Sequence, residues 1–232
     1  MMKYAVVTGS SRGIGAALCK TLAANGYNVA VCYNTGETLA YKLCEELSTK
    51  GFSIPVRLDV SDPLSVKNAF SYVFSCFPRI DLLINNAAID VIKPFEETTL
   101  DDWRRILDVD LTGVFLTSKE VVEKMRDGGG TIINVSSVWA KKGAACEIPY
   151  SASKAGLEGF TRSLAAEYPE LKVYAVSLGY VDTDMNADLT ERDIEVFLQE
   201  NPDVKRKTPE DVAKEIFDTI STAKSGETLI LW

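Results

Sequence analysis

Strand-like and helix-like segments alternate along the whole chain, and this alternation limits the possible folds more than any other feature. Short apolar runs rich in β-branched residues are separated by longer segments with apolar residues at helical spacing. This order predicts a parallel sheet covered by helices, because parallel neighbours need long crossover connections. Most of the short runs are apolar throughout, which indicates strands buried on both faces of the sheet.

The expected elements fill the chain without a linker or an internal repeat. Strands are expected over 3–8, 27–33, 53–60, 80–88, 130–137, 172–178 and 227–232. Helices are expected over 14–25, 37–51, 63–77, 99–125, 150–167 and 208–222. We therefore expect an α/β fold with a single domain over residues 1–232, a Rossmann-type doubly wound parallel sheet of about seven strands with helices on both faces. The polar stretch 182–207 is expected to form a lid over a site.

Charge and composition exclude several classes of partner. The formal net charge of the 232 residues is -8, which argues against binding to nucleic acid or to an anionic membrane. No apolar run approaches the ~20 residues of a membrane span, and the first residues lead directly into a strand rather than a signal peptide. Five scattered cysteines predict reduced thiols in a cytoplasmic protein. The chain has no histidine, so we expect no His-based triad and no metal site.

A glycine-rich turn joins the first strand to the first helix, with the sequence TGSSRGIG over residues 8–15. The backbone N–H groups of such a turn bind an anion, and its glycines let a pyrophosphate approach the main chain. A purely structural turn is the alternative, but the position at the first strand-to-helix junction favours a dinucleotide. The spacing lacks the lysine of a P-loop. The expected cofactor contacts here are Gly9, Ser11, Arg12, Gly13, Ile14 and Gly15.

The arginine in this turn bears on the choice of cofactor. Arg12 is either a solvated surface charge or a partner for an additional phosphate. Folds that select NAD place an acid at the end of the second strand, and here no carboxylate appears before Glu37. This pattern favours NADP(H), with NAD(H) still possible. Asn34 is expected to add neutral hydrogen bonds near the same phosphate.

A tyrosine and a lysine four residues apart suggest proton chemistry. Tyr150 and Lys154 share one face of an expected helix, and a lysine beside a tyrosine is expected to lower the tyrosine pKa from about 10. Such a tyrosine is a usable acid or base near neutral pH. Ser137 ends the fifth expected strand, at the sheet edge where these folds bind ligands. An exposed Tyr–Lys pair and a strand-end serine are the alternatives.

These motifs together resemble the short-chain dehydrogenase/reductase family, in the branch that contains the 3-oxoacyl-carrier-protein reductases. The resemblance rests on TGSSRGIG, LDV at 58–60, NNAA at 85–88, the serine at 137, YSASK from Tyr150 and GYVDTDM at 179–185. It implies that Tyr150 protonates a carbonyl oxygen, that Lys154 holds the ribose and supports the phenolate, and that Ser137 binds the substrate oxygen. Further cofactor contacts that it implies are Asp59 and Val60 at the adenine, Asn86 and Ala87 at the cofactor floor, and Val181 and Thr183 at the carboxamide.

One departure from the family pattern concerns the proton relay. Asp110 stands where the family has an asparagine, so it keeps a backbone carbonyl to hold water but loses the amide donor. Overall we expect an NADPH-preferring reductase that converts a ketone into a secondary alcohol by hydride transfer. Its partner is a small-molecule carbonyl substrate, with a 3-oxoacyl compound among the possibilities, and we expect a homodimer or homotetramer. The alternative is a non-catalytic dinucleotide-binding regulator of the same fold.

Overall fold

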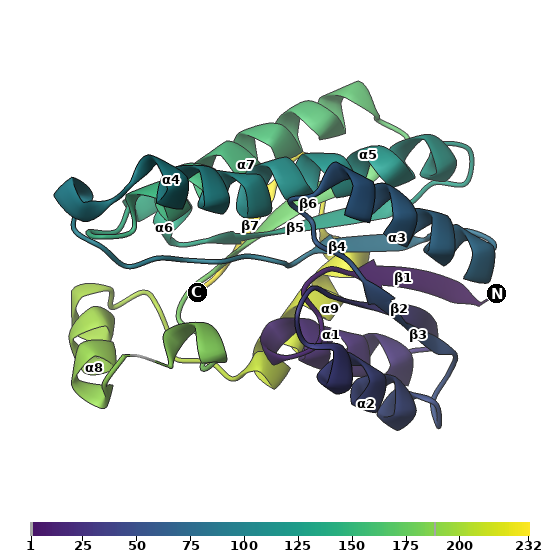
Figure 1. The fold of residues 1–232 in the computed structure, drawn as a ribbon, viewed down its shortest axis with the longest axis horizontal. Helices are drawn as coiled ribbons and strands as arrows, with labels where there is room; N and C mark the ends of the chain where they lie inside the picture. The colour runs from purple at the N-terminus through teal and green to yellow at the C-terminus, as the bar shows by residue number, and fades with distance from the viewer. Residues whose placement is uncertain (1, 188) are drawn as a thin grey trace.

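The computed structural model describes residues 2–187 and 189–232 (Figure 1), and within them seven parallel strands form one sheet. The strand order is β3-β2-β1-β4-β5-β6-β7. From β1 the chain adds strands toward one edge of the sheet, and from β4 it adds them toward the other edge, which confirms the doubly wound prediction. Such a reversal leaves a crevice at the carboxyl ends of the strands, where ligands bind. The strands are β1 Lys3–Val7, β2 Tyr27–Tyr33, β3 Ser53–Arg57, β4 Leu82–Asn85, β5 Thr131–Ser137, β6 Lys172–Leu178 and β7 Thr228–Leu231.

Helices cover both faces of the sheet, as the alternation predicted (Figure 1). One face carries α1 Gly13–Ala24, α2 Glu37–Leu47 and α9 Pro209–Thr222, and the other carries α3 Pro63–Cys76, α5 Gly113–Met125 and α7 Ile148–Glu167. Each layer buries its own apolar cluster against the strands. None of the helices in the described ranges is long and apolar enough to cross a membrane.

The long helix expected over 99–125 is interrupted. It consists of α4 Leu100–Leu107, a π-helical turn η2 Asp108–Thr112, and α5. The extra residue of a π turn changes the direction of the side chains that follow, and such turns are frequent at functional sites. Asp110 lies in this turn and is fully buried. Helical periodicity alone did not predict the interruption.

The predicted lid 182–207 is partly helical, and one of its residues, 188, lies outside the described part of the chain. It contains the short helix η3 Asp184–Asn186 and the helix α8 Glu191–Glu200, which lies apart from the two helix layers (Figure 1). A small separate core holds α8, in which Ile194 packs with Tyr180 and Val204. Two further short helices are η1 Phe95–Glu97 and α6 Trp139–Lys142.

Candidate active site

The glycine turn between β1 and α1 has no room for side chains. Gly9 has φ +61°, and a Cβ there would lie 2.8 Å from the Cα of Ala87. A Cβ on Gly15 would lie 2.5 Å from the Gly9 carbonyl oxygen. Gly13 also has a positive φ of +55°. The backbone therefore stays bare beside the first turn of α1, the arrangement that a pyrophosphate needs for close approach.

Two hydroxyl groups that the sequence analysis did not single out hold this turn to its neighbours. The Thr8 hydroxyl oxygen accepts hydrogen bonds from the backbone N–H groups of Asn86 and Ala87, both at 3.0 Å. The Asn86 amide in turn donates to the Thr8 carbonyl oxygen at 2.9 Å. On the other side, the Ser10 hydroxyl accepts from the Cys32 N–H at 2.9 Å. Thus β1, β2 and β4 present one rigid edge toward a cofactor.

The residues expected at the adenosine end lie at the ends of β2 and β3. Asp59 accepts hydrogen bonds from the backbone and hydroxyl of Ser61 at 3.0 and 2.6 Å, and the side chain of Asn34 also bonds to it. Burial opposes ionisation of Asp59, but these hydrogen bonds hold its pKa below its ordinary value. Val60 packs against the start of α5, because a Cβ on Gly113 would lie 2.8 Å from its Cγ2.

Arg12 extends from the glycine turn toward the lid. Its Nε lies 3.7 Å from Oδ2 of Asp184, and the two side chains are 60% and 75% exposed. Thr183 also faces the turn, since its Cγ2 lies 3.6 Å from where a Cβ on Gly13 would be. The β1–α1 turn and the segment after β6 therefore meet, although about 170 residues of sequence separate them.

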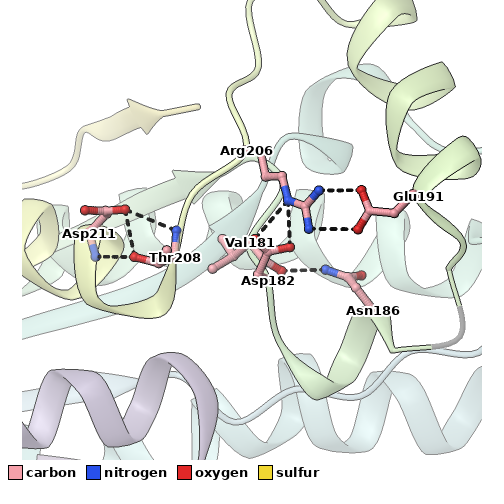
Figure 2. A network of polar contacts seen from close by, with 7 residues as sticks. All are labelled: Val181, Asp182, Asn186, Glu191, Arg206, Thr208 and Asp211. Atoms are coloured by element: carbon pink, nitrogen blue, oxygen red, sulfur yellow. Dashed lines mark hydrogen bonds and ion pairs between the residues drawn. The ribbon is translucent and has the colours of Figure 1, made fainter.

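Figure 2 shows how the two ends of the lid are held together. Arg206 donates through Nε to Asp182 at 2.9 Å, and its two terminal nitrogens bond to the Glu191 carboxylate at 2.7 and 3.1 Å. Val181 forms a bridge with Lys207, and its carbonyl oxygen accepts from the side-chain amide of Asn186 at 2.8 Å. These contacts hold Val181 and the residues that follow it in place at the start of the lid.

Ser137, Tyr150 and Lys154 converge at the carboxyl end of β5. The Tyr150 hydroxyl is hydrogen-bonded to Ser137, and the Lys154 Nζ lies 5.3 Å from the centroid of the Tyr150 ring. Lys154 is 3% exposed and donates to the Val135 carbonyl oxygen at 3.2 Å. The helical spacing therefore does place the two residues of α7 on one inward face.

Asp110 contacts this group from the π-helical turn. Its Oδ1 accepts from the Ile89 N–H at 2.9 Å, and its Oδ2 lies 3.3 Å from the Lys154 Nζ. Burial raises the pKa of Asp110 to about 6, an effect that the Lys154 charge partly offsets. The prediction that the Tyr150 pKa lies below its ordinary value of about 10 is wrong for this structure. Burial and the nearby Asp110 carboxylate raise the pKa of Tyr150 above its ordinary value.

A second pair of carboxyl groups lies beside Tyr150 and was missed at the sequence level. Asp90 follows β4 and Glu147 precedes α7, and a hydrogen bond of 2.9 Å from the Lys93 N–H to the Cys146 carbonyl oxygen joins the two segments. Burial and a hydrogen bond with Asp90 raise the pKa of Glu147 to about 9, so Glu147 is protonated at neutral pH. The only clue in the sequence is that each acid lies within a few residues of a recognised motif.

A cavity of about 530 Å³ opens between Glu147 and the helix α8 of the lid. Its walls come from the segment around α6 and from α8, and they combine the apolar side chains of Trp139, Val196 and Phe197 with charged ones such as Lys142 and Arg192. Trp139 and Phe197 pack edge to face with ring centroids 5.3 Å apart, so one wall is apolar. The position between Glu147 and α8 makes this cavity the candidate substrate pocket.

Residues 3–194 match the family described as short chain dehydrogenase. The chain belongs to the short-chain dehydrogenase family. It is 36% identical to the 3-oxoacyl-[acyl-carrier-protein] reductase FabG of Aquifex aeolicus, over 91% of this chain and 87% of that protein. It is also 36% identical to the acetoacetyl-CoA reductase of Cupriavidus necator, over 97% of this chain and 92% of that protein.

Solved structures of short-chain dehydrogenases superpose closely on the fold. A dehydrogenase/reductase from Sinorhizobium meliloti 1021 has a TM-score of 0.91 at 30% identity, over 98% of this chain and 92% of that one. A blue fluorescent protein from a metagenomic library, solved in complex with NADPH, has a TM-score of 0.90 at 33% identity, over 99% and 96% of the two chains. This short-chain dehydrogenase is therefore an oxidoreductase that binds a nicotinamide dinucleotide and acts on a small molecule.

Proposed function

We propose that this short-chain dehydrogenase is an NADPH-preferring reductase that converts a ketone into a secondary alcohol. The observation that carries the proposal is the convergence of Ser137, Tyr150 and Lys154 at the strand end beside the bare glycine turn. The bound dinucleotide supplies a hydride to the carbonyl carbon. The chain's own residues then need only hold the carbonyl oxygen and deliver one proton to it.

Each of the three residues has a separate task. The Ser137 and Tyr150 hydroxyls hydrogen-bond the carbonyl oxygen, and Tyr150 transfers its phenolic proton to that oxygen as negative charge develops. Lys154 has three N–H donors. One bonds to the Val135 carbonyl and one faces Asp110, which leaves the third for a ribose hydroxyl of the cofactor. Asn86 and Ala87, fixed by Thr8, form the floor under the same cofactor.

Two features support the preference for NADPH. Arg12 lies in the glycine turn with most of its side chain exposed, where it can bind a 2′-phosphate. The first carboxylate after β2 is Glu37, which accepts a hydrogen bond from the Tyr33 hydroxyl at 3.2 Å. Glu37 is the first residue of α2, four positions after the last residue of β2, so it is not the strand-end acid that NAD-selective folds place at the ribose.

The substrate belongs to the proposal only at the level of its class. Relatives include reductases of 3-oxoacyl carrier-protein and acetoacetyl-CoA thioesters, so a 3-oxoacyl compound is one candidate. The apolar wall formed by Trp139 and Phe197 is compatible with an acyl chain. A cytoplasmic location and assembly as a homodimer or homotetramer stay predictions.

The test is consumption of NADPH by the purified chain with a panel of 3-oxoacyl thioesters, small diketones and aminoketones. We expect turnover with at least one class, and Tyr150→Phe is expected to lose about 10²-fold or more in turnover while it binds NADPH normally. Retained turnover in Tyr150→Phe would show that another group is the acid. A wild type that binds NADPH but reduces no ketone would instead favour the non-catalytic regulator.

A further inference from the structure

The carboxylate of Asp110 is placed unusually for a group without a direct role in proton transfer. It is completely buried, and within the described residues its Oδ2 has no hydrogen-bond partner. The nearest positive charge is the Lys154 ammonium at 3.3 Å, while Oδ1 is held by the Ile89 N–H. A buried charge of this kind is costly unless a partner compensates it, so Asp110 and Lys154 act as one electrostatic unit.

Ionisable groups from three segments lie near Tyr150. Asp110 approaches from the π-helical turn, Asp90 from the loop after β4, and Glu147 and Lys154 from the start and first turns of α7. Glu147 holds a proton at neutral pH because its pKa is raised to about 9, so it adds no full negative charge there. An ammonium beside a phenol favours the phenolate, and a carboxylate favours the neutral phenol. The protonation state of Tyr150 therefore depends on the combined effect of the Asp110 and Lys154 charges.

We propose that Asp110 is a positioning residue that compensates the charge of Lys154 and keeps the Tyr150 phenol protonated at neutral pH, so that the acid needed for ketone reduction is already formed there. This inference rests on the proposed function. An asparagine at position 110 would carry no charge and would leave the ammonium uncompensated beside the phenol. The Asp110 carboxylate is buried in a region of low dielectric. Its charge there changes the pKa of Tyr150 much more than the same charge would in water.

The proton balance explains why the protonation state of Tyr150 sets the pH dependence of each direction. In reduction, the carbonyl carbon accepts the hydride, the carbonyl oxygen accepts the proton of the Tyr150 hydroxyl, and the phenolate that remains is reprotonated from solvent. In oxidation, the phenolate must first accept the alcohol proton while the hydride returns to the oxidised dinucleotide. A tyrosine that stays protonated at neutral pH is ready for the first reaction and must be deprotonated for the second.

The experiment is a pH titration of Tyr150 by NMR of the protein labelled with ¹³Cζ-tyrosine, with the resonance assigned by its loss in Tyr150→Phe. Asp110→Asn is expected to lower the Tyr150 pKa by about one pH unit or more. Asp108→Asn is the matched control, because it makes the same charge change in the same π-helical turn at an exposed position. It is expected to leave the Tyr150 pKa within a few tenths of the wild-type value. Asp110→Ser removes the charge without placing an amide beside Lys154 and is expected to act in the same direction.

The pH profile of alcohol oxidation gives a second readout. Its rising limb is expected to move to lower pH in Asp110→Asn by the same amount as the NMR midpoint. An unchanged or raised Tyr150 pKa in both Asp110 variants, in folded protein, would overturn the proposal. The NMR titration needs no turnover, so failure of this inference can be told apart from failure of the proposed reductase activity.

Discussion

Replacement of Arg12 by alanine tests the proposed cofactor preference, and the structure changes the magnitude that the sequence alone would suggest. Arg12 projects from the glycine turn, and its Nε already faces the Asp184 carboxylate at 3.7 Å. A 2′-phosphate must therefore compete with Asp184 for the guanidinium. We expect Arg12→Ala to weaken NADPH binding and to leave NADH binding nearly unchanged, because NADH carries no 2′-phosphate.

The size of the effect follows from two terms. A charge-assisted contact between arginine and phosphate contributes about 1.5–3 kcal/mol. The pair with Asp184 is largely exposed, so solvent screening limits its contribution to about 0.2–1 kcal/mol. The difference is about 0.5–2.8 kcal/mol, which corresponds to a loss of roughly two- to hundredfold in NADPH affinity.

The assay is fluorescence titration of wild type, Arg12→Ala and Asp184→Asn with NADPH and with NADH. Asp184→Asn is the matched variant, because it removes the competitor and leaves the arginine in place. It is expected to strengthen NADPH binding by about two- to fivefold. Equal affinity of the wild type for the two cofactors would refute the reasoning, and so would an Arg12→Ala variant that weakens both alike.

Two further predictions concern stability and pH. Gly9→Ala and Gly26→Ala both place a side chain at positive φ, at a cost of about 1–2 kcal/mol, but only at Gly9 would the new Cβ meet Ala87, at 2.8 Å. Thermal unfolding is expected to show the larger loss for Gly9→Ala, together with weakened NADPH binding, and equal losses would contradict the close packing. The pKa of Glu147 is raised from 4.5 to about 9 in the folded state, so between these two pH values the folded protein binds more protons than the unfolded chain. Its stability therefore falls as the pH rises from 4.5 to about 9. Glu147→Gln is therefore expected to raise the Tm by more near pH 9 than near pH 4.5, and a gain independent of pH would argue against the raised pKa of Glu147.

The order of the elements was determined by the sequence, because local patterns carry that information. Apolar β-branched runs, helix caps and the glycine turn act within a few residues of each other. Asp62 caps α3, and Thr208 forms a capping box with Asp211 at the start of α9, in both cases through contacts within three residues. The same local patterns located the strand-end motifs, and the parallel sheet then brought Asn86, Ser137 and Thr183 to one edge.

The electrostatics of the site were decided only by the tertiary structure. The ion pair of Asp110 with Lys154 depends on a π-helical turn, which arises from packing rather than from helix propensity. Asp90 and Glu147 are far apart in sequence, and the pKa of Glu147 is raised only because folding desolvates it and brings it against Asp90. Periodicity and spacing report which residues share a face, but they contain no information on desolvation. The protonation state of Tyr150 therefore follows from the assembled fold, in which distant carboxyl groups and one ammonium meet in a region of low dielectric.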